Sequence, residues 1–263
     1  MIRFLKIGSD PEFFIRDSET KEYLPSFYFT EGTKTNPLEL GNDYKILKDN
    51  LVIEGNIPPA GTKEEWINNM LFLKNKIKEA ISVISTAQIF EGDIAPFKRE
   101  FINTEDGQSF GCSTFIDAWE NQVKTSPIFF DKNRTCGCHV HISYDITEDS
   151  SITNKEVINI ALARALDFFL GIPSDSIFYC KKRRDGYGTL GAFRNTSYGM
   201  EYRPLGGHFA KDIYLGWIYE QVQKAISWLN IDGNFSKILS LENPDIRHYN
   251  FLEINFNDQI KIE

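Results

Sequence analysis

The chain has 263 residues, with 29 Lys and Arg against 37 Asp and Glu, so its formal net charge is -8 at pH 7. A chain of this length buries a sizeable core, and the acidic balance disfavours general binding to nucleic acid or anionic membranes, which need cations to displace counterions. No apolar stretch approaches the roughly 18 residues of a membrane span, and the apolar N-terminal segment is too short for a signal peptide. We therefore expect a cytoplasmic protein.

The chain is expected to form a single domain over residues 1–263, because no repeat or Gly/Ser linker divides it. The predicted elements are strands over 1–16, 50–57, 86–92, 136–144 and 198–205, helices over 63–84, 155–171, 211–230 and 244–250, and a loop region up to residue 133. Strands and helices mix without a strict βαβ rhythm, which favours an α+β fold with a mostly antiparallel sheet.

Two of the predicted helices carry boundary signals. Thr62 followed by Glu65 is typical of a capping box, and Asn154 is a favourable N-cap for the second helix. Gly171 and Pro173 predict that this second helix ends there.

Four predicted strands carry polar residues two positions apart, and residues at i and i+2 lie on the same face of a sheet. The pairs are Asp10 with Glu12, Glu54 with Asn56, His139 with His141, and Glu201 with Arg203. A carboxylate within an apolar strand is costly unless it is paired or bound to a metal. If all four pairs face one surface, they predict a metal-dependent site.

Each pair taken alone has a simpler interpretation. Asp10-Pro11 is also a turn signal, Glu54 also suits an exposed strand, and many His-x-His pairs are not ligands. Glu201 and Arg203 also suit a surface ion pair. It is their joint occurrence that favours the metal site.

The ligand types favour Mg²⁺ or Mn²⁺, because carboxylates with one or two imidazoles form a hard, oxygen-rich set. Cys136 and Cys138 beside His139 also raise the possibility of structural zinc. Alternation along a strand opposes it, since the two cysteines would point away from His139 and His141. We expect both cysteines to be small core residues.

A basic, Gly-rich segment over 181–196 supplies the complementary charge. Arg183, Arg184 and Arg194 are predicted to lie on mobile loop backbone, where guanidinium groups would neutralise a transferring phosphate. A solvated basic loop is the alternative. The sequence contains no P-loop and no Rossmann glycine fingerprint in a strand–helix context, so a nucleotide would be held in another way.

The ordered set of motifs resembles the phage-type carboxylate–amine (COOH–NH2) ligases and, more distantly, glutamate–cysteine ligase and glutamine synthetase. The segments that carry the resemblance are Gly8-Ser-Asp-Pro-Glu-Phe-Phe14, Glu54-Gly-Asn-Ile-Pro-Pro-Ala60, Gly137-Cys-His-Val-His-Ile142 and Gly191-Ala-Phe-Arg194 followed by Tyr198-Gly-Met-Glu-Tyr-Arg203.

The resemblance implies a glutamine-synthetase-like fold, in which a curved, mostly antiparallel sheet holds ATP and divalent metals on its concave face and helices pack on its convex face. It also implies that ATP phosphorylates a carboxylate and that an amine attacks the acyl phosphate to give an amide. Small-molecule or peptide carboxylates and amines are then the expected partners, with no nucleic acid or membrane, and oligomerisation is left open.

The resemblance also implies roles for particular residues. Those expected to bind Mg²⁺ or Mn²⁺ are Asp10, Glu12, Glu54, His139 and Glu201. Those expected to act on the transferring phosphate or the substrate are Arg203, Arg194 and His141, and those expected to bind ATP are Arg183, Arg184, Arg194 and Asn56. Segments 20–48 and 93–133 are expected to form the substrate pocket.

Two other functions remain open on the sequence alone. A metal-dependent hydrolase would also use a His-x-His pair with strand carboxylates. A degenerate ligase fold retained as a non-catalytic binding protein would keep the same motifs.

Overall fold

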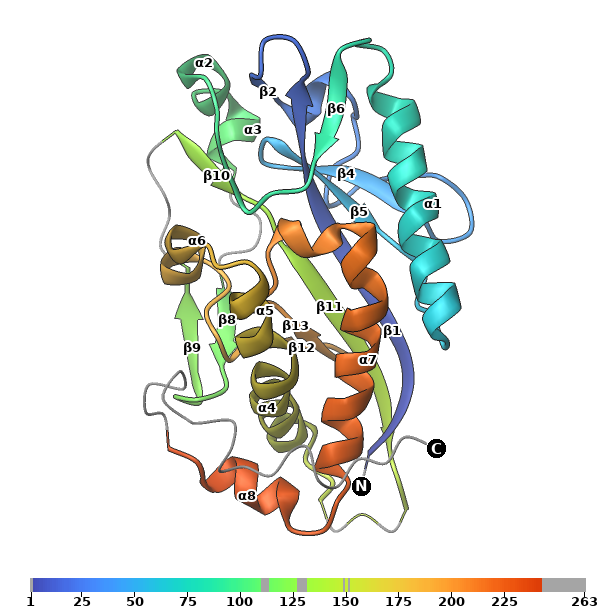
Figure 1. Ribbon diagram of the computed structural model, residues 1–263, viewed down its shortest axis with the longest axis vertical. Coiled ribbons are helices and arrows are strands. Elements are labelled where there is room, and N and C mark those ends of the chain that lie inside the picture. The colour runs from blue at the N-terminus through green and yellow to red at the C-terminus, as the bar shows by residue number, and fades with distance from the viewer. Residues whose placement is uncertain (1, 110–113, 127–131, 149, 151, 243–263) are drawn as a thin grey trace.

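The computed structural model describes residues 2–109, 114–126, 132–148, 150 and 152–242, and within them it contains one large sheet covered by helices (Figure 1). The strands of this sheet are β1 (Ile2–Asp17), β2 (Tyr23–Leu24), β3 (Leu38–Glu39), β4 (Lys45–Asp49), β5 (Val52–Asn56), β6 (Ala87–Phe90), β8 (Thr114–Asp117), β9 (Gln122–Thr125), β11 (Cys138–Ile146), β12 (Ala192–Asn195) and β13 (Gly199–Tyr202). Their order is β3-β4-β5-β1-β11-β13-β12-β8-β9, and β2 and β6 also pair with β1. A separate pair is formed by β7 (Ile94–Pro96) and β10 (Asn133–Thr135).

Three long helices, α1 (Lys63–Ile81), α4 (Lys155–Leu166) and α7 (Asp212–Leu229), pack on the sheet and on one another (Figure 1). The π-helical segment η2 (Asp167–Gly171) continues α4 into α5 (Ile172–Ile177). The shorter helices are η1 (Ser26–Tyr28), α2 (Arg99–Ile102), α3 (Glu105–Gln108), α6 (Lys181–Gly186), η3 (Gly207–Ala210) and α8 (Asn234–Ser240).

The two faces of the central strands differ in chemistry. Ile7 and Phe13 of β1, with Val140 and Ile142 of β11, are fully buried in the core that the helices cover. Because side chains alternate along a strand, the residues between them point to the opposite face. The apolar residues of these strands therefore fix which polar residues meet on the other face.

The α+β class with antiparallel pairing is confirmed, because every strand pairing in the described chain is antiparallel. The capping box is confirmed as well: Thr62 accepts from the backbone N–H of Glu65, whose side chain accepts from the backbone of Thr62. The strand positions are also close to those predicted. The predicted helix over 244–250 lies outside the described residues.

Three expectations about local structure are wrong. Gly171 and Pro173 do not end the second helix, because the π-helical segment η2 leads directly into α5, which has Pro173 near its N-terminus. The region up to residue 133 contains β7, α2, α3, β8 and β9 rather than loop alone, and the basic segment over 181–196 contains α6 and β12.

The continuous helix Lys155–Ile177 is long and apolar enough to cross a membrane by length and composition alone. The expectation that no apolar stretch approaches that length is therefore wrong for this helix. However, 83% of the most apolar part of this helix is buried inside the protein, so packing in the core accounts for its apolar character.

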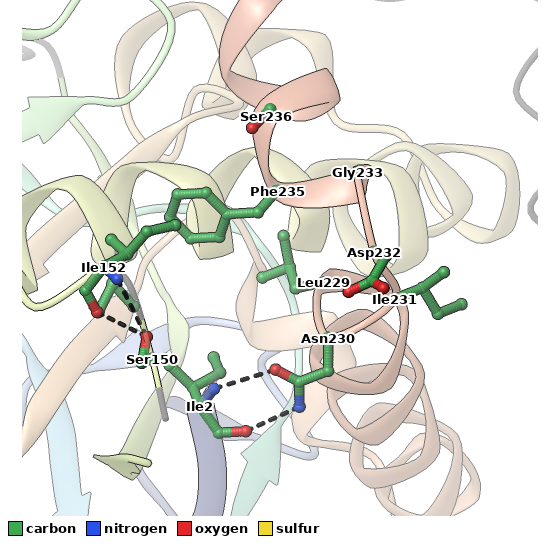
Figure 2. A pocket seen from close by; sticks show the side chains of 11 residues that line it. Ile2, Ser150, Ile152, Leu229, Asn230, Ile231, Asp232, Gly233, Phe235 and Ser236 are labelled. Carbon is green, nitrogen blue, oxygen red and sulfur yellow. Dashed lines mark hydrogen bonds between the residues drawn. The ribbon is translucent and has the colours of Figure 1, made fainter. Parts of the chain in front are cut away.

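The start of β1 is tied to the end of α7 by one side chain. Asn230 accepts from the backbone N–H of Ile2 at 3.0 Å and donates to its carbonyl at 2.7 Å, as Figure 2 shows. These residues border a cavity of about 190 Å³ beside Phe235 of α8. Ile2 pairs with Ile146 of β11, and the bonds to Asn230 satisfy the backbone N–H and carbonyl of Ile2.

We expect Trp66→Ala to lower the free energy of unfolding by about 3–5 kcal/mol, because it empties a large core volume. Trp66 is fully buried, and its Nε1 donates to the carbonyl of Leu215 at 2.8 Å, which joins α1 to α7. Urea unfolding measures the change. Asn75→Ala, on the exposed face of the same helix, should change stability by less than about 0.5 kcal/mol. Equal effects of the two substitutions would contradict this account of the core.

Candidate metal centre

Strand register brings the predicted polar pairs onto one face of the sheet. Asp10 lies opposite His139, and Glu12 lies opposite Glu54. On the other side of β11, His141 lies opposite Glu201. Directly opposed residues on antiparallel strands share a face, so these side chains line the surface that the long helices leave uncovered.

A first cluster is formed by Asp10, His139 and Glu201, whose nearest ligand atoms all lie within 4.8 Å of one another. Asp10 Oδ1 is 3.1 Å from His139 Nδ1 and 3.2 Å from His141 Nε2. His139 Nδ1 is also 3.4 Å from Glu201 Oε1. Carboxylate and imidazole atoms at this spacing suit a divalent cation.

Three buried polar atoms at this cluster make no well-aligned hydrogen bond within the described residues: Asp10 Oδ1, His139 Nδ1 and Nε2 of the neighbouring His141, although the oxygen lies within 3.2 Å of both nitrogens. Buried polar atoms in folded proteins nearly always make a hydrogen bond, and atoms that make none often bind an ion or a water molecule. All three atoms converge on the same space. The donor set therefore fits a metal ion.

The electrostatics of the first cluster agree with this fit. Burial lowers the pKa of His139, which favours the neutral imidazole that coordinates metals. Burial alone would raise the pKa of Asp10, but His139 and His141 outweigh it and hold that pKa well below its usual range. Burial would likewise lower the pKa of His141, but Asp10 raises it overall. Asp10 is thus an anion around which the two rings are arranged.

A second cluster is formed by Glu12, Asp49 and Glu54, whose ligand atoms also lie within 4.8 Å of one another. Burial, followed by repulsion from Asp49 and Asp10, raises the pKa of Glu12 to about 8. Burial and the same aspartates raise the pKa of Glu54 well above its usual value. Without a cation this cluster retains protons, so a metal that binds here has to displace them.

Lys34 partly offsets the charge of the second cluster. Its Nζ is 2.8 Å from Asp49 Oδ2 and 3.6 Å from Glu54 Oε2. Glu12 Oε2 also accepts a hydrogen bond of 2.6 Å from the backbone N–H of Gly137. The second cluster is therefore better satisfied by the protein itself than the first.

His139 is oriented from its other ring nitrogen. The hydroxyl of Tyr187 lies 2.9 Å from His139 Nε2, and Arg203 Nη2 donates to the same hydroxyl at 2.7 Å. Because Tyr187 engages Nε2, Nδ1 is left to face Asp10 and Glu201. Groups that orient a histidine in this way hold its ring for metal binding.

The arginines fall into two groups. Arg203 donates to Glu201, and Arg194 Nη1 lies 3.8 Å from Glu201 Oε2, so both guanidinium groups border the first cluster. Arg183 is buried and donates to the carbonyls of Cys136, Pro204 and Leu205. Arg184 donates to Gly188, Pro204 and Asp175. The donors of Arg183 and Arg184 thus hold the local backbone. Arg194 also donates from Nε to the carbonyl of Thr114 at 2.8 Å, but its Nη1 faces Glu201.

A pocket of about 410 Å³ adjoins the first cluster on its His141 side. Its lining includes Asn56, and His141 Nδ1 is 2.7 Å from the hydroxyl of Tyr198 at its edge. The pocket thus lies mainly between β1, β5 and β11. The segments expected to form a substrate pocket contribute only Lys45 to it.

The two cysteines are core residues, as expected. Cys136 and Cys138 are fully buried, and neither belongs to a metal-ligand cluster in the described chain. They lie in different apolar clusters, Cys138 under the long helices and Cys136 beside Phe14. Burial raises the pKa of Cys138 to about 12, which keeps it a thiol.

Four residues of this region were not predicted from the sequence: Asp49, Lys34, Tyr187 and Asp167. Asp49 ends β4, and Leu47 stands two positions before it, so no polar i, i+2 pair marks it. Lys34 lies in a segment without a readable motif, and Tyr187 in the segment considered only for its arginines. These residues reach the site through the fold of the chain rather than through a motif in the sequence.

Asp167 anchors β13 from the helix side. It accepts from Trp119 Nε1 at 2.6 Å and from the hydroxyl of Tyr202 at 2.7 Å, and Tyr202 lies between Glu201 and Arg203 in the chain. Asp167 begins the π-helical segment, and such segments are frequent at functional sites. It holds β13 in place without facing the candidate site.

We expect Asp167→Asn to destabilise the protein by about 1–3 kcal/mol at pH 5. The reason is that the –NH2 group of asparagine would face the N–H donor of Trp119 and cannot accept its hydrogen bond. Burial raises the pKa of Asp167 from 3.8 to about 7. Between pH 3.8 and about 7 the folded state binds a proton on Asp167 more tightly than the unfolded state does. The stability that this group supplies to the wild type therefore falls as pH rises. The asparagine cannot ionise, and its cost relative to wild type should shrink by pH 8. Urea unfolding at both pH values tests this, and a larger cost at pH 8 would contradict it.

We expect millimolar Mn²⁺ to raise the melting temperature of the wild-type protein by about 5–10 °C, because it fills a site of unpaired carboxylate and imidazole atoms. Asp10→Asn should remove most of this shift, and Asp49→Asn should remove a smaller part. Arg3→Ala, which breaks an exposed ion pair with Asp145, is the control and should keep the full shift. Equal shifts in Asp10→Asn and wild type would exclude the first cluster as the site.

Comparison with known families gives one match. Residues 129–215 match the family described as phage phiEco32-like COOH-NH2 ligase-type 2. A search among curated proteins found no match. The matched segment contains His139, His141, Arg194, Glu201 and Arg203, whereas the acids of β1, β4 and β5 lie outside it. The predicted resemblance to phage-type carboxylate–amine ligases is thereby confirmed over residues 129–215, and the general kind of reaction that this family implies is the ligation of a carboxylate to an amine.

Proposed function

We propose that this protein is an ATP-dependent carboxylate–amine ligase that forms an amide or peptide-like bond through an acyl phosphate. The observation that carries the proposal is the convergence of Asp10, His139 and His141 beside Arg194 and Arg203. A cation site next to guanidinium groups is the arrangement that phosphoryl transfer requires. The family match supports the type of bond formed.

The proposed reaction has two steps. A carboxylate oxygen of the substrate bonds to the γ-phosphorus of ATP while the bond to the bridging oxygen breaks, and ADP leaves with the electron pair. The amine nitrogen then attacks the acyl carbon, inorganic phosphate leaves, and the amine loses a proton. No protein nucleophile is needed, which agrees with the buried, protonated state of Cys138.

Asp10, His139 and Glu201 would hold one Mg²⁺ or Mn²⁺, and Glu12, Glu54 and Asp49 a second. When bound, these ions would neutralise phosphate oxygens and align them with the carboxylate.

The chain's own residues would orient and neutralise the transferring group. Arg194 and Arg203 border Glu201 and would donate to phosphate oxygens as negative charge spreads over them. Glu201 holds both guanidinium groups toward the cluster, and Tyr187 links Arg203 to His139. We assign His141 to positioning the substrate, because its ring separates the first cluster from the pocket.

The wider assignments belong to the same proposal. We propose a glutamine-synthetase-like arrangement of the sheet, a cytoplasmic location, and small-molecule or peptide carboxylates and amines as substrates. The net charge of -8 argues against nucleic acid and anionic membranes as partners.

The decisive assay traps the acyl phosphate with hydroxylamine, which converts it to a hydroxamate that is coloured by iron(III). We expect Mg-ATP, hydroxylamine and a pool of carboxylic acids to give hydroxamate together with ADP. Asp10→Asn should remove detectable turnover, and Arg194→Lys should lower kcat by about 10²–10³-fold, because it removes a fixed donor to the developing charge. Arg3→Ala is the matched control and should retain wild-type activity.

Two results would contradict this function. Hydrolysis of esters or phosphodiesters without ATP, lost in His139→Ala, would support a metal-dependent hydrolase instead. Binding of Mg-ATP that survives Asp10→Asn, His139→Ala and Glu201→Ala, with no product formed by wild type, would indicate a non-catalytic binding protein.

A further inference from the structure

The pocket beside His141 has no role assigned so far. It measures about 410 Å³ and is lined by residues of β1, β4, β5 and β11, with Ile57, Pro59 and Gly8 contributing apolar surface. Pockets of this size hold small ligands with a few polar contacts that fix their orientation. A second cavity of about 190 Å³ lies beside the start of β1, and among the described residues that line it Asp232 is the one that carries a charge (Figure 2).

The charged residues of the larger pocket are both cations, Lys6 and Lys45. Lys6 is exposed and has no ion-pair partner among the residues that the structure describes. Lys45 pairs with Glu39 at 3.0 Å, but the two side chains are 36% and 60% exposed, so this pair is weak and readily exchanged. A ligand in this pocket would therefore meet positive charge at the Lys6 and Lys45 side.

Along β11 the site has a fixed order. Ser143 and His141 line the pocket, whereas His139 belongs to the first cluster and contacts Tyr187, which also binds Arg203. The proposed phosphate ligand Arg203 therefore lies at the His139 end, and the pocket lies at the His141 end. Arg194, the second proposed phosphate ligand, lies on β12, two strands away from His141 and on the side of β11 opposite β1 and β5. In phosphoryl transfer the attacking and leaving oxygens are roughly in line, so the acceptor carboxylate enters from the side opposite the nucleotide.

We propose that the pocket beside His141 binds the carboxylate substrate, and that this substrate is a short acid with a second anionic group held by Lys6 and Lys45. This inference rests on the proposed ligase function. The reacting carboxylate faces the Asp10–His141 side, and the apolar lining contacts the connecting carbon chain. Asn56 was predicted from the sequence to bind ATP. In this proposal it lines the carboxylate pocket instead.

The test compares three acids of equal chain length: glutarate, with a second carboxylate, valerate, with a methyl group in its place, and delta-aminovalerate, with an ammonium group. We expect wild-type hydroxamate formation with glutarate to exceed that with valerate at least tenfold in kcat/KM. Lys6→Glu should abolish this preference and raise kcat/KM for delta-aminovalerate relative to glutarate. Lys78→Glu, an equal charge change on the exposed face of α1, should leave the ratios unchanged.

Thermal shifts without ATP separate the failure of this inference from failure of the ligase function. Glutarate should raise the melting temperature of wild type but not of Lys6→Glu, even if no product forms in any assay. If hydroxamate forms but the ratio of glutarate to valerate is the same in wild type and Lys6→Glu, the inference is wrong and the ligase function stands. If Lys6→Glu weakens binding of ATP and leaves glutarate binding unchanged, the pocket is a nucleotide subsite and the inference is also wrong.

Discussion

The rest of this structure depends on the register of four neighbouring strands, β5, β1, β11 and β13. Pairing of Asp10 with His139, Glu12 with Glu54, and His141 with Glu201 concentrates acids and imidazoles on one face. A shift of one residue in any pairing would turn these groups into the helix-covered core. The apolar residues between them, such as Phe13 and Val140, prevent such a shift because they are fully buried on the opposite face. The hydrophobic core therefore determines the geometry of the candidate site.

This arrangement has an electrostatic cost that a cation would relieve. Glu12 and Glu54 have raised pKa values because they are buried near Asp10 and Asp49. The unpartnered atoms of Asp10, His139 and His141 lie beside them. Lys34, Arg194 and Arg203 offset part of the negative charge from the edges of the site. A bound divalent metal would offset the charge of the carboxylates, and a bound phosphate would offset the charge of the arginines.

Sequence patterns predicted the fold class and the strand pairs well, because alternation in β1, β5, β11 and β13 is set by local chemistry. The same reasoning failed at Pro173, where a π-helical segment lets the helix continue through a residue that usually ends one. It also placed Arg183 and Arg184 on mobile loop backbone. In the structure both side chains donate hydrogen bonds to backbone carbonyls, Arg183 to those of Cys136 and Pro204 and Arg184 to that of Pro204. Asp49 and Tyr187 join the site only through tertiary packing, which no spacing in the sequence records.

The most direct measurement of the central claim is a crystal structure with Mn²⁺ and a non-hydrolysable ATP analogue, with the metal located by its anomalous scattering. The account predicts a manganese peak between Asp10, His139 and Glu201, and a terminal phosphate within hydrogen-bond distance of Arg194 or Arg203. A manganese peak elsewhere, or a phosphate bound away from both arginines, would contradict it.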